Sequence, residues 1–306
     1  MNWLTRRRFL AVSACAALGA SARSQDTPQR VTWQGVAFGA DIRITLDGPE
    51  QITRPALARA RLEIEAYEAR FSLFRADSQL VQLNAQGGLP DLDRRWHDIV
   101  QVSDRLHEAT EGLFDPTIQS LWLAHAYGLD LQAARSAIGW QNVQLPGPGR
   151  RGLRLASGQA LTFNGIAQGA ATDAVRQVLR EAGLTHVLVD IGETATIGGP
   201  WHLGFSDPLA GLRASVRLTD AAFAVSSPGA LQISASASHI LDPSEQRLPK
   251  WASVGVVATD AALADGFSTA ACLMTEAALR SAARRLDGVT RLLLADAQGR
   301  LTDITL

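Results

Sequence analysis

The chain has 306 residues, 46% of them hydrophobic, with 29 basic and 30 acidic side chains and a formal net charge of −1. This length and apolar content suffice to bury one large core or two coupled ones. The near-neutral balance argues against a nucleic-acid or membrane-surface partner. The two cysteines, Cys15 and Cys272, do not suit a disulfide framework or a thiolate metal site. Cys272 stands in an apolar, helix-like run, where we expect a buried, inert thiol.

The first 22 residues are predicted to be a twin-arginine export signal. The arginines at residues 6–8 are followed by an apolar run over residues 9–20, about half the length that spans a bilayer as a helix. Small residues at 20–22 provide a cleavage site, so we expect the mature chain to begin at Arg23. Cleavage removes three arginines and no acid, which leaves a net charge of −4.

A second interpretation of this segment reads residues 12–15 as a lipobox, with a lipid on Cys15. The apolar stretch before these residues is short for a signal core, so lipidation is the less favoured interpretation. Both interpretations predict a protein that works in the periplasm.

The apolar patterning predicts, in chain order, helices and strands in irregular succession. A strand pair over residues 32–46 precedes helices over 55–70, 94–109 and 167–182, the last of them ended by Gly183. Short apolar segments between turn residues then predict strands at 187–189, 201–205, 214–218, 222–225 and 253–258. Helices over 261–274 and 276–286 and a hairpin of 291–295 with 301–304 close the chain. Without regular strand–helix–strand repetition, this order favours an α+β fold.

Four short segments join glycine or turn residues to the start of a helix, at residues 71–78, 112–117, 164–173 and 264–269. In the third, Asn164 and Gly165 precede a helix whose first N–H groups lack helical partners. Such a helix end can hold a phosphate or diphosphate. An ordinary N-cap with a tight turn explains the same two residues.

In the fourth segment, Asp265, Ser268 and Thr269 lie at i, i+3 and i+4 of a predicted helix, so their oxygens project from one face. Magnesium takes oxygen ligands in an octahedral array, and two or three from one helix are enough when water and substrate phosphate supply the rest. The alternative is capping, with Asp265 as N-cap and the two hydroxyls bonded to carbonyls one turn back.

Two further positions are ambiguous from spacing alone. His239, just before the turn at Asp242, would act as an acid or base near neutral pH or bond across the turn. Asp115 precedes a proline, which is a common way to open a turn.

Seven motifs follow one another along the chain: FSxFxxDS…LN, FDPT, GIAxG…D, VDIG, WxxGxxDP, HIxDP and ADxxST. In this order and spacing, residues 23–306 resemble a single domain of the ApbE flavin transferases. The resemblance implies an α+β fold of mixed helices and antiparallel sheets, with FAD between a mainly helical part and a β-rich part. It also implies a magnesium ion beside the FAD diphosphate and an FAD:protein FMN transferase, which moves FMN from FAD to a Ser or Thr of another protein and releases AMP.

The resemblance also implies roles for individual residues. Asp265, Ser268 and Thr269 become metal ligands, together with the backbone carbonyl of Gly165, and His239 becomes the general acid/base, with Asp242 or Asp190 to orient it. The expected cofactor contacts are Phe38 and Phe74 at the isoalloxazine, Leu113, Phe114 and Asp115 in the adenosine or flavin pocket, Thr162 and Gln168 near the nucleotide, and Ile240.

Several positions depart from the family pattern. The usual Lys or Glu before the second glycine of GIAxG is Gln168, and the usual DSE ends in Gln79. VDxGGN reads VDIGET over residues 189–194, and TSG reads SSPG over 226–229. A glutamine supplies no charge, so we expect altered polar contacts to the flavin. The intact magnesium helix and His239 favour retained catalysis.

Three functions are therefore open to test. The first is FMN transfer to an exported or membrane redox protein, such as a membrane electron-transfer subunit. The second is an FAD pyrophosphatase that uses water in place of the acceptor hydroxyl. The third is a carrier or assembly factor that binds FAD without turnover.

Overall fold

The structure is a computed structural model that describes residues 29–147, 149 and 151–306. The predicted signal over residues 1–22, its cleavage site and the alternative lipid site at Cys15 lie outside the described residues. Within the described part of the chain, no helix is long and apolar enough to cross a membrane.

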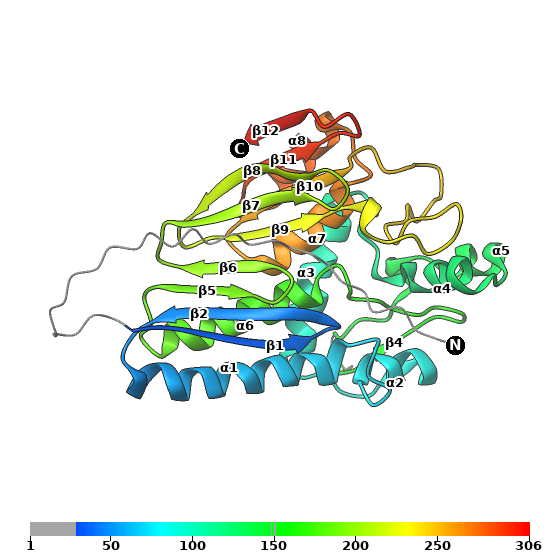
Figure 1. Ribbon diagram of the computed structural model, residues 1–306. Coiled ribbons are helices and arrows are strands. Elements are labelled where there is room, and N and C mark those ends of the chain that lie inside the picture. The colour runs from blue at the N-terminus through cyan, green and yellow to red at the C-terminus, as the bar shows by residue number, and fades with distance from the viewer. Residues whose placement is uncertain (1–28, 148, 150) are drawn as a thin grey trace, which may run out of the picture.

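An eight-stranded sheet forms the centre of the molecule, in the order β1-β2-β5-β6-β9-β10-β11-β12 (Figure 1). Every neighbouring pair in it is antiparallel. The strands are β1 (Arg30–Ala37), β2 (Ala40–Asp47), β5 (Val187–Asp190), β6 (Thr194–Ile197), β9 (Ala222–Ser226), β10 (Ser253–Ala258), β11 (Val289–Ala295) and β12 (Leu301–Thr305). The predicted α+β class with antiparallel sheets is confirmed.

Helices cover one face of this sheet, and a separate two-stranded hairpin covers part of the other. The main core lies between the sheet and the helices α1 (Glu50–Phe71), α3 (Arg94–Ala109), α6 (Ala167–Glu181), α7 (Ala261–Ala271) and α8 (Glu276–Arg285). A second core, which includes Phe205, Phe223 and Leu293, lies between the sheet and the hairpin of β7 (Trp201–Asp207) and β8 (Gly211–Leu218).

The helix α3 shows why the periodicity prediction succeeds. Its buried stripe includes Trp96, Ile99 and Leu106, spaced at helical intervals. The N-cap is Asp93, whose carboxylate accepts a hydrogen bond from the Trp96 N–H at 3.2 Å. The predicted bounds of 94–109 are those of the structure.

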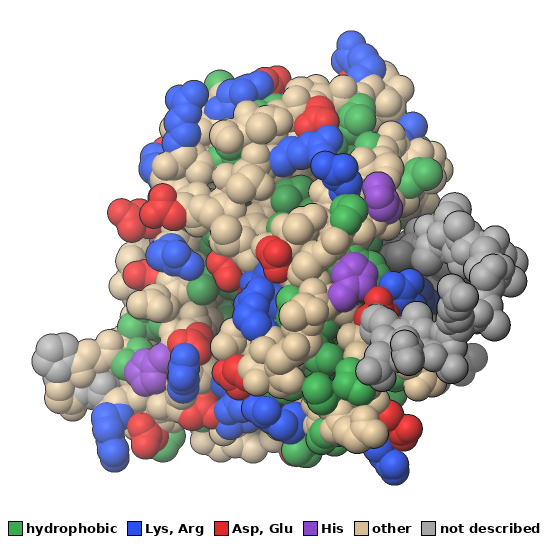
Figure 2. Space-filling model, turned by 90° about the vertical axis from the view of Figure 1, so that its left-hand side faces the viewer, with side chains coloured by type: hydrophobic (Ala, Val, Ile, Leu, Met, Phe, Trp, Pro, Cys, Tyr) green, Lys and Arg blue, Asp and Glu red, His purple; other side chains and the backbone are tan. Residues whose placement is uncertain are grey.

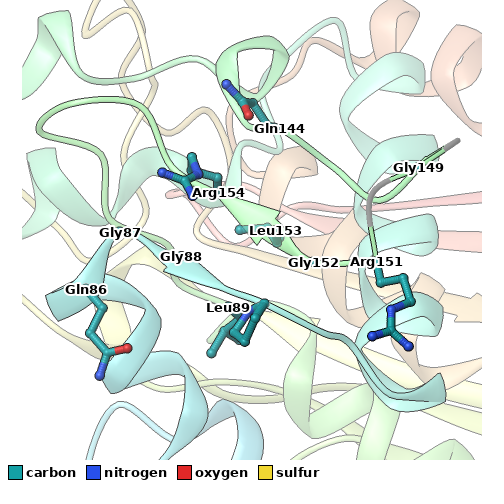
Figure 3. A pocket seen from close by; sticks show the side chains of 11 residues that line it. Gln86, Gly87, Gly88, Leu89, Gln144, Gly149, Arg151, Gly152, Leu153 and Arg154 are labelled. Atoms are coloured by element: carbon teal, nitrogen blue, oxygen red, sulfur yellow. The ribbon is translucent and has the colours of Figure 1, made fainter.

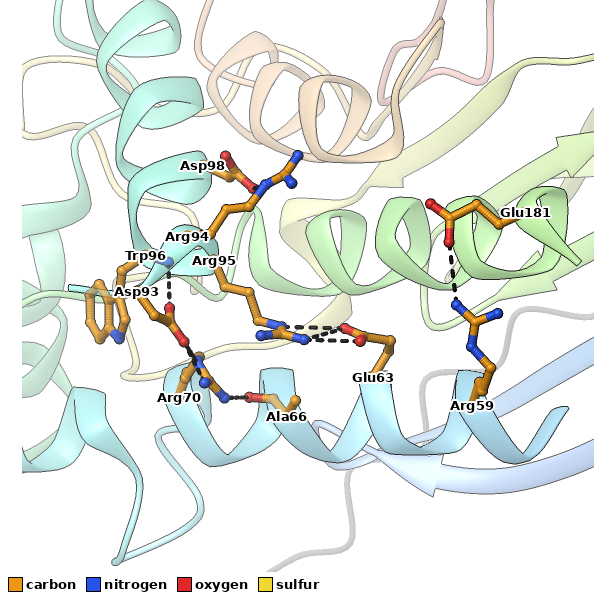
Figure 4. Close-up of polar contacts among 10 residues, drawn as sticks. All are labelled: Arg59, Glu63, Ala66, Arg70, Asp93, Arg94, Arg95, Trp96, Asp98 and Glu181. Carbon is orange, nitrogen blue, oxygen red and sulfur yellow. Dashed lines mark hydrogen bonds and ion pairs between the residues drawn. The ribbon is translucent and has the colours of Figure 1, made fainter. Parts of the chain in front are cut away.

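Ion pairs join the long helix α1 to its neighbours (Figure 4). Arg95 of α3 binds Glu63 of α1 at 2.8 Å, and Arg59 of α1 lies 3.3 Å from Glu181 of α6. The second pair is about half exposed at both partners, so it adds little to stability.

Several elements differ from the predictions. Helix α1 begins at Glu50, five residues before the predicted start at 55, and holds Pro55 in its second turn. Helix α7 ends at Ala271 rather than 274. The patterning missed the short elements α2 (Gln79–Gln86), α4 (Gln119–Tyr127), α5 (Leu131–Ser136), β3 (Gly88–Leu89), β4 (Leu153–Arg154) and β6. These are too short to show a period of their own.

Several chain reversals lie at the same ends of the strands, on the right in Figure 1. The β1–β2 turn at Phe38, the β5–β6 turn at residues 191–193, the β7–β8 turn at 208–210 and the end of β9 at Ser226 all lie there. We call this the site edge. The opposite side of the molecule carries interspersed acidic and basic side chains (Figure 2).

Candidate active site

A cleft at the site edge contains three of the predicted cofactor contacts. It is lined by the β1–β2 turn, the segment after α1 and the start of α6, through Phe38, Gly39, Ala40, Ser72, Phe74, Asn164, Ala167 and Gln168. Phe74 is 62% exposed although it is a large apolar side chain. Two aromatic rings at the mouth of a cleft suit a flat, partly apolar ligand such as an isoalloxazine.

The turn that carries Phe38 is unusual. Phe38 has a backbone φ of +52°, in the left-handed region that non-glycine residues rarely occupy. Its N–H donates to the Glu68 carboxylate of α1 at 2.7 Å, which ties the turn to the helix. Strain of this kind concentrates at functional sites, so the conformation agrees with a ligand-facing role for Phe38.

Gln168 connects this cleft to the turn between β5 and β6. The side chain is 7% exposed and lies against Gly192, where a Cβ would come within 2.4 Å of Gln168 Nε2. Gly192 also has a φ of +87°, so no other residue fits this position without strain. The carboxylate of the next residue, Glu193, accepts from the Val225 N–H of β9 at 3.3 Å.

The residues predicted as metal ligands lie around the crossing of α6 and α7. Gly165 lies so close to α7 that a Cβ on it would be 3.0 Å from Thr269 Oγ1. The Ser226 hydroxyl lies 2.7 Å from Ser268 Oγ and 3.3 Å from Thr269 Oγ1. Asp265 is 4% exposed and accepts from the Gly169 N–H at 3.1 Å. The segment 164–169 thus forms one wall of the cleft and touches this cluster of hydroxyl and carboxylate groups.

The helices α6 and α7 cap each other through aspartates. Asp265 of α7 binds the N–H of Gly169 in the first turn of α6. Asp173 of α6 accepts at 2.9 Å from both Ala261 N–H and Ala262 N–H, the first two amides of α7. Burial raises the pKa of Asp173 to about 6, although Arg176 and these amides act against the rise. Each aspartate satisfies donors that its neighbour helix cannot satisfy itself.

These bonds exclude one part of the capping interpretation of Asp265. The N-cap of α7 is Asp260, and Asp265 is the fifth residue of the helix, so Asp265 does not cap α7. Part of the capping alternative holds, because the Ser268 hydroxyl donates to the Asp265 carbonyl at 2.9 Å. The first turn of α6 also has few amides to offer a phosphate, since Ala167 N–H donates to the Phe163 carbonyl and Gly169 N–H to Asp265.

The hydroxyl protons in the cluster can be assigned by counting. A serine or threonine has one hydroxyl proton, and that of Ser268 goes to the Asp265 carbonyl. The 2.7 Å contact then requires Ser226 to donate to Ser268, and the 3.3 Å contact requires Thr269 to donate to Ser226. This order leaves the lone pairs of Thr269 Oγ1 for another group, as a metal ligand needs.

The other predicted cofactor contacts, Leu113, Phe114, Asp115 and Ile240, pack against the core or bind backbone groups. Phe114 packs at the α3–α7 contact, within 3.3 Å of a Cβ placed on Gly266. The Asp115 carboxylate accepts from Thr117 N–H, Thr117 Oγ1 and Trp140 N–H, so the turn-opening interpretation holds. Leu113 is half-buried against the main core, whereas Ile240 is 5% exposed, belongs to that core and does not line the cleft.

Thr162 links two of the motifs. Its N–H donates to the Pro116 carbonyl at 2.9 Å, and its hydroxyl accepts from Asn164 N–H at 3.1 Å. Asn84 of α2 binds both backbone groups of the neighbouring Leu161. These hydrogen bonds therefore hold the FDPT turn, α2 and the segment before α6 together.

His239 lies on the irregular segment between β9 and β10. Its N–H donates to the Leu231 carbonyl at 3.0 Å, and its Nδ1 lies 3.3 Å from the same oxygen. Of the two orienting groups predicted for it, Asp242 uses its carboxylate on Ser244, Gln246 and Arg247 of its own turn. The bond described for the His239 ring is to the Leu231 carbonyl, and an orienting role for Asp242 or Asp190 stays a prediction.

Gln79, one of the departures, has a structural contact. Its side-chain oxygen accepts from the Trp96 indole N–H at 2.5 Å and so joins α2 to α3. The expectation that Gln79 alters contacts to the flavin has no counterpart among the contacts described for it. Cys272 is fully buried, as expected, and burial raises the pKa of its thiol.

A larger hollow, of about 560 Å³, lies elsewhere, along β3 and β4 (Figure 3). Glycines and backbone form much of its wall, and the charged residues in the described part of the wall are Arg151 and Arg154. None of the predicted site residues lines it. Phe38, Phe74 and Gln168 instead line the smaller cleft at the site edge.

Sequence reasoning missed two contributors to the site. Asp173 stood in the GIAxG…D motif without an assigned role, and Ser226 was noted only as a departure from TSG. Pairing between β9 and β10 brings Ser226 opposite α7, which spacing along the chain does not reveal. In the described residues there is no group of three or more His, Cys, Asp or Glu side chains that could hold a metal. The cluster instead combines one carboxylate with hydroxyls, an all-oxygen set that fits magnesium rather than zinc.

Comparisons with known proteins identify the family of the chain. The ApbE family model matches residues 38–293, so the chain belongs to the ApbE family. Comparison with curated proteins gives no match.

Three solved structures illustrate the shared fold. The flavin transferase ApbE from Vibrio cholerae is 20% identical, with a TM-score of 0.75 over 91% of this chain and 97% of that one. The apo form of the Pseudomonas stutzeri flavinyl transferase ApbE is 24% identical, with a TM-score of 0.76 over 92% and 96%. The ApbE protein of Thermotoga maritima is 22% identical, with a TM-score of 0.78 over 90% and 96%.

Proposed function

We propose that this protein is a magnesium-dependent FAD:protein FMN transferase. It would move FMN from FAD to a Ser or Thr of an exported or membrane redox protein and release AMP. The observation that carries the proposal is the contact of Gly165 with Thr269 and of Gly169 with Asp265, beside the cleft that Phe38 and Phe74 line. Membership of the ApbE family and the fold shared with two flavin transferases support it.

In this proposal the chain's own residues bind and orient FAD. Phe38 and Phe74 would contact the isoalloxazine, and Gln168, held against Gly192, would offer its amide to the nucleotide. Asp265, Thr269 and the Gly165 carbonyl would hold the magnesium ion, with Ser268 close by. When bound, magnesium neutralises charge on the diphosphate oxygens and on the departing AMP.

The acceptor hydroxyl is a poor nucleophile at neutral pH and needs a base as it attacks the FMN phosphorus. His239 is the proposed base. Its Nδ1 faces the Leu231 carbonyl, a partner that favours the proton on Nδ1 and leaves Nε2 as the basic nitrogen. The twin-arginine signal would direct the protein to the periplasm, where exported acceptors fold.

The test is a mass measurement on an acceptor. Protein lacking residues 1–22 is incubated with FAD, magnesium and a candidate acceptor domain, with the Vibrio cholerae flavin transferase as positive control. The proposal expects the acceptor to gain the mass of one FMN, and His239→Asn and Asp265→Asn to abolish the gain. An unchanged acceptor beside a flavinylated positive control would refute FMN transfer.

The same reactions separate the two other functions. AMP release that depends on Asp265 but needs no acceptor would indicate a pyrophosphatase. FAD recovered unchanged and in stoichiometric amount would indicate a carrier.

A further inference from the structure

The Asp207-Pro208 motif has no role in the site as described so far. Asp207 ends β7 and is 6% exposed. One carboxylate oxygen accepts from Leu209 N–H at 2.9 Å and Ala210 N–H at 2.8 Å, which shapes the β7–β8 turn. The other oxygen accepts from Ser253 Oγ, the first residue of β10, at 2.5 Å. Burial disfavours the Asp207 carboxylate, but these donors hold its pKa below the usual range, so it is ionised at neutral pH.

A second hydrogen bond connects Ser253 to the residue that follows β9. Ser253 is fully buried, and its Oγ lies 2.6 Å from Ser227 Oγ. An ionised carboxylate only accepts, so the single hydroxyl proton of Ser253 goes to Asp207. Ser227 must then donate to Ser253. The chain of bonds runs in one direction, from Ser227 through Ser253 to Asp207, and all three residues are buried.

Ser227 directly follows Ser226, which contacts the metal-binding cluster. The backbone at Ser227 is extended, with φ −138° and ψ 107°, and successive side chains of an extended segment point to opposite sides. Ser226 reaches Ser268 and Thr269 on the helical side of the sheet. Ser227 binds toward Asp207 on the hairpin side. The end of β9 is thus held from both faces of the sheet.

We propose that Asp207 is a positioning residue for the metal-binding residues, acting through Ser253 and Ser227 to fix Ser226. The inference rests on the proposed metal site. Ser226 takes the hydroxyl proton of Thr269 and so directs the lone pairs of that oxygen away from the sheet. A change in the position of Ser226 would leave Thr269 free to rotate. Outer partners of metal ligands typically change metal affinity by about 10- to 100-fold when removed.

The experiment measures metal binding directly. Mn²⁺ replaces Mg²⁺ as a probe visible by electron paramagnetic resonance and is titrated into the FAD-loaded protein. Ser253→Ala breaks the chain of bonds at its centre and is expected to raise the Kd for Mn²⁺ by about 10-fold. If Ser253→Ala does not fold, Ser227→Ala breaks the same chain at its other end.

The matched control is Thr196→Val in β6 of the same sheet. Thr196 is fully buried, and its hydroxyl donates to the Ala221 carbonyl and accepts from the Ala221 N–H, without contact to the cluster. Both variants lose a buried hydroxyl with two hydrogen bonds, but Ser253→Ala also takes a donor from the ionised Asp207, so it should melt at the lower temperature of the two. Only Ser253→Ala should bind Mn²⁺ more weakly.

A third variant, Asp207→Asn, tests the chain itself. Its amide can accept from Leu209 and Ala210 and donate to Ser253, which reverses the bonds but keeps their number. We expect it to bind Mn²⁺ within about 2-fold of the native protein, far less than the 10-fold loss typical of a broken outer partner. An equal Kd in Ser253→Ala, Thr196→Val and the native protein would overturn the positioning role of Asp207 but not the metal site. Absence of Mn²⁺ binding in the FAD-loaded native protein would overturn the metal site as well.

Discussion

The close crossing of α6 and α7 at Gly169 predicts the effect of adding one methyl group. A Cβ on Gly169 would lie 2.4 Å from the Ala261 carbonyl oxygen and 2.7 Å from the Ala262 Cα, both backbone atoms of α7. Ordinary contacts begin near 3.4 Å, so Gly169→Ala must separate the helices by about 1 Å, because a packed interior yields little.

Two opposing terms set the change in stability. Overpacking a well-filled interior costs about 1–3 kcal/mol, and alanine returns about 0.5–1 kcal/mol over glycine within a helix. The net loss is therefore at most about 2.5 kcal/mol, which corresponds to a melting temperature lowered by at most roughly 5–10 °C. The larger effect falls on function, since the separation stretches the 3.1 Å bond from Gly169 N–H to Asp265. A displacement of about 1 Å at a catalytic group can cost about 100-fold in rate.

Thermal unfolding and Mn²⁺ titration of the FAD-loaded protein measure the two effects. Gly147→Ala is the matched control, because Gly147 has no neighbour within 4 Å of its Cβ position and no positive φ. We expect Gly147→Ala to behave as the native protein. If Gly169→Ala melted with the control and bound Mn²⁺ equally well, the helix crossing would not be tight and the reasoning would fail.

Three other predictions concern charged groups. Burial raises the pKa of Asp190 to about 6, whereas an aspartate in the unfolded chain has a pKa of about 4. Between these two pH values the folded protein binds a proton at Asp190 that the unfolded chain does not. The unfolding free energy of the native protein minus that of Asp190→Asn should therefore rise as the pH falls from 7 to 4, by up to about 1.4 kcal/mol per pH unit; denaturant melts would contradict this if the difference were flat. Glu245→Gln should lower the free energy of unfolding by less than about 1 kcal/mol. It should still speed hydrogen exchange in residues 231–250, because Glu245 binds His125 and Arg135 and so holds this segment. Unchanged exchange would contradict the prediction. Asp265→Asn should keep the fold, since an amide oxygen can still accept from Gly169 N–H, but weaken Mn²⁺ binding by more than about 10-fold in calorimetric titration; native affinity in this variant would exclude Asp265 as a ligand.

The fold was predictable wherever a local pattern was long enough. Helix α3 and the strands around residues 187 and 253 appear as expected, since burial of one stripe or one whole strand marks the sequence directly. Helix α1 began earlier than predicted because Pro55, a common first-turn residue, is accommodated inside it. The strand β6 has four residues, all buried, and two of them are threonines. So short a segment cannot be distinguished from a turn by its pattern.

The spacing of the candidate site residues along one helix was predictable, and their tertiary contacts were not. The spacing of Asp265, Ser268 and Thr269 correctly places them together on α7, because i, i+3 and i+4 share a face. Their partners Ser226 and Gly169 are distant in sequence and meet them only through tertiary packing. Asp242, which we predicted as an orienting group for His239, uses its carboxylate within its own turn, a contact that the spacing does not reveal.

The mutual capping of α6 and α7 has a consequence for how the site comes into being. Neither helix has a complete N-terminal turn until the other is docked, because Asp173 and Asp265 each supply the missing acceptor. A partial opening between α6 and α7 therefore displaces the α6 wall of the cleft and the cluster of hydroxyl and carboxylate groups on α7 together. A proteolytic or exchange experiment should find the two helix starts unprotected at the same moment, as a single cooperative unit.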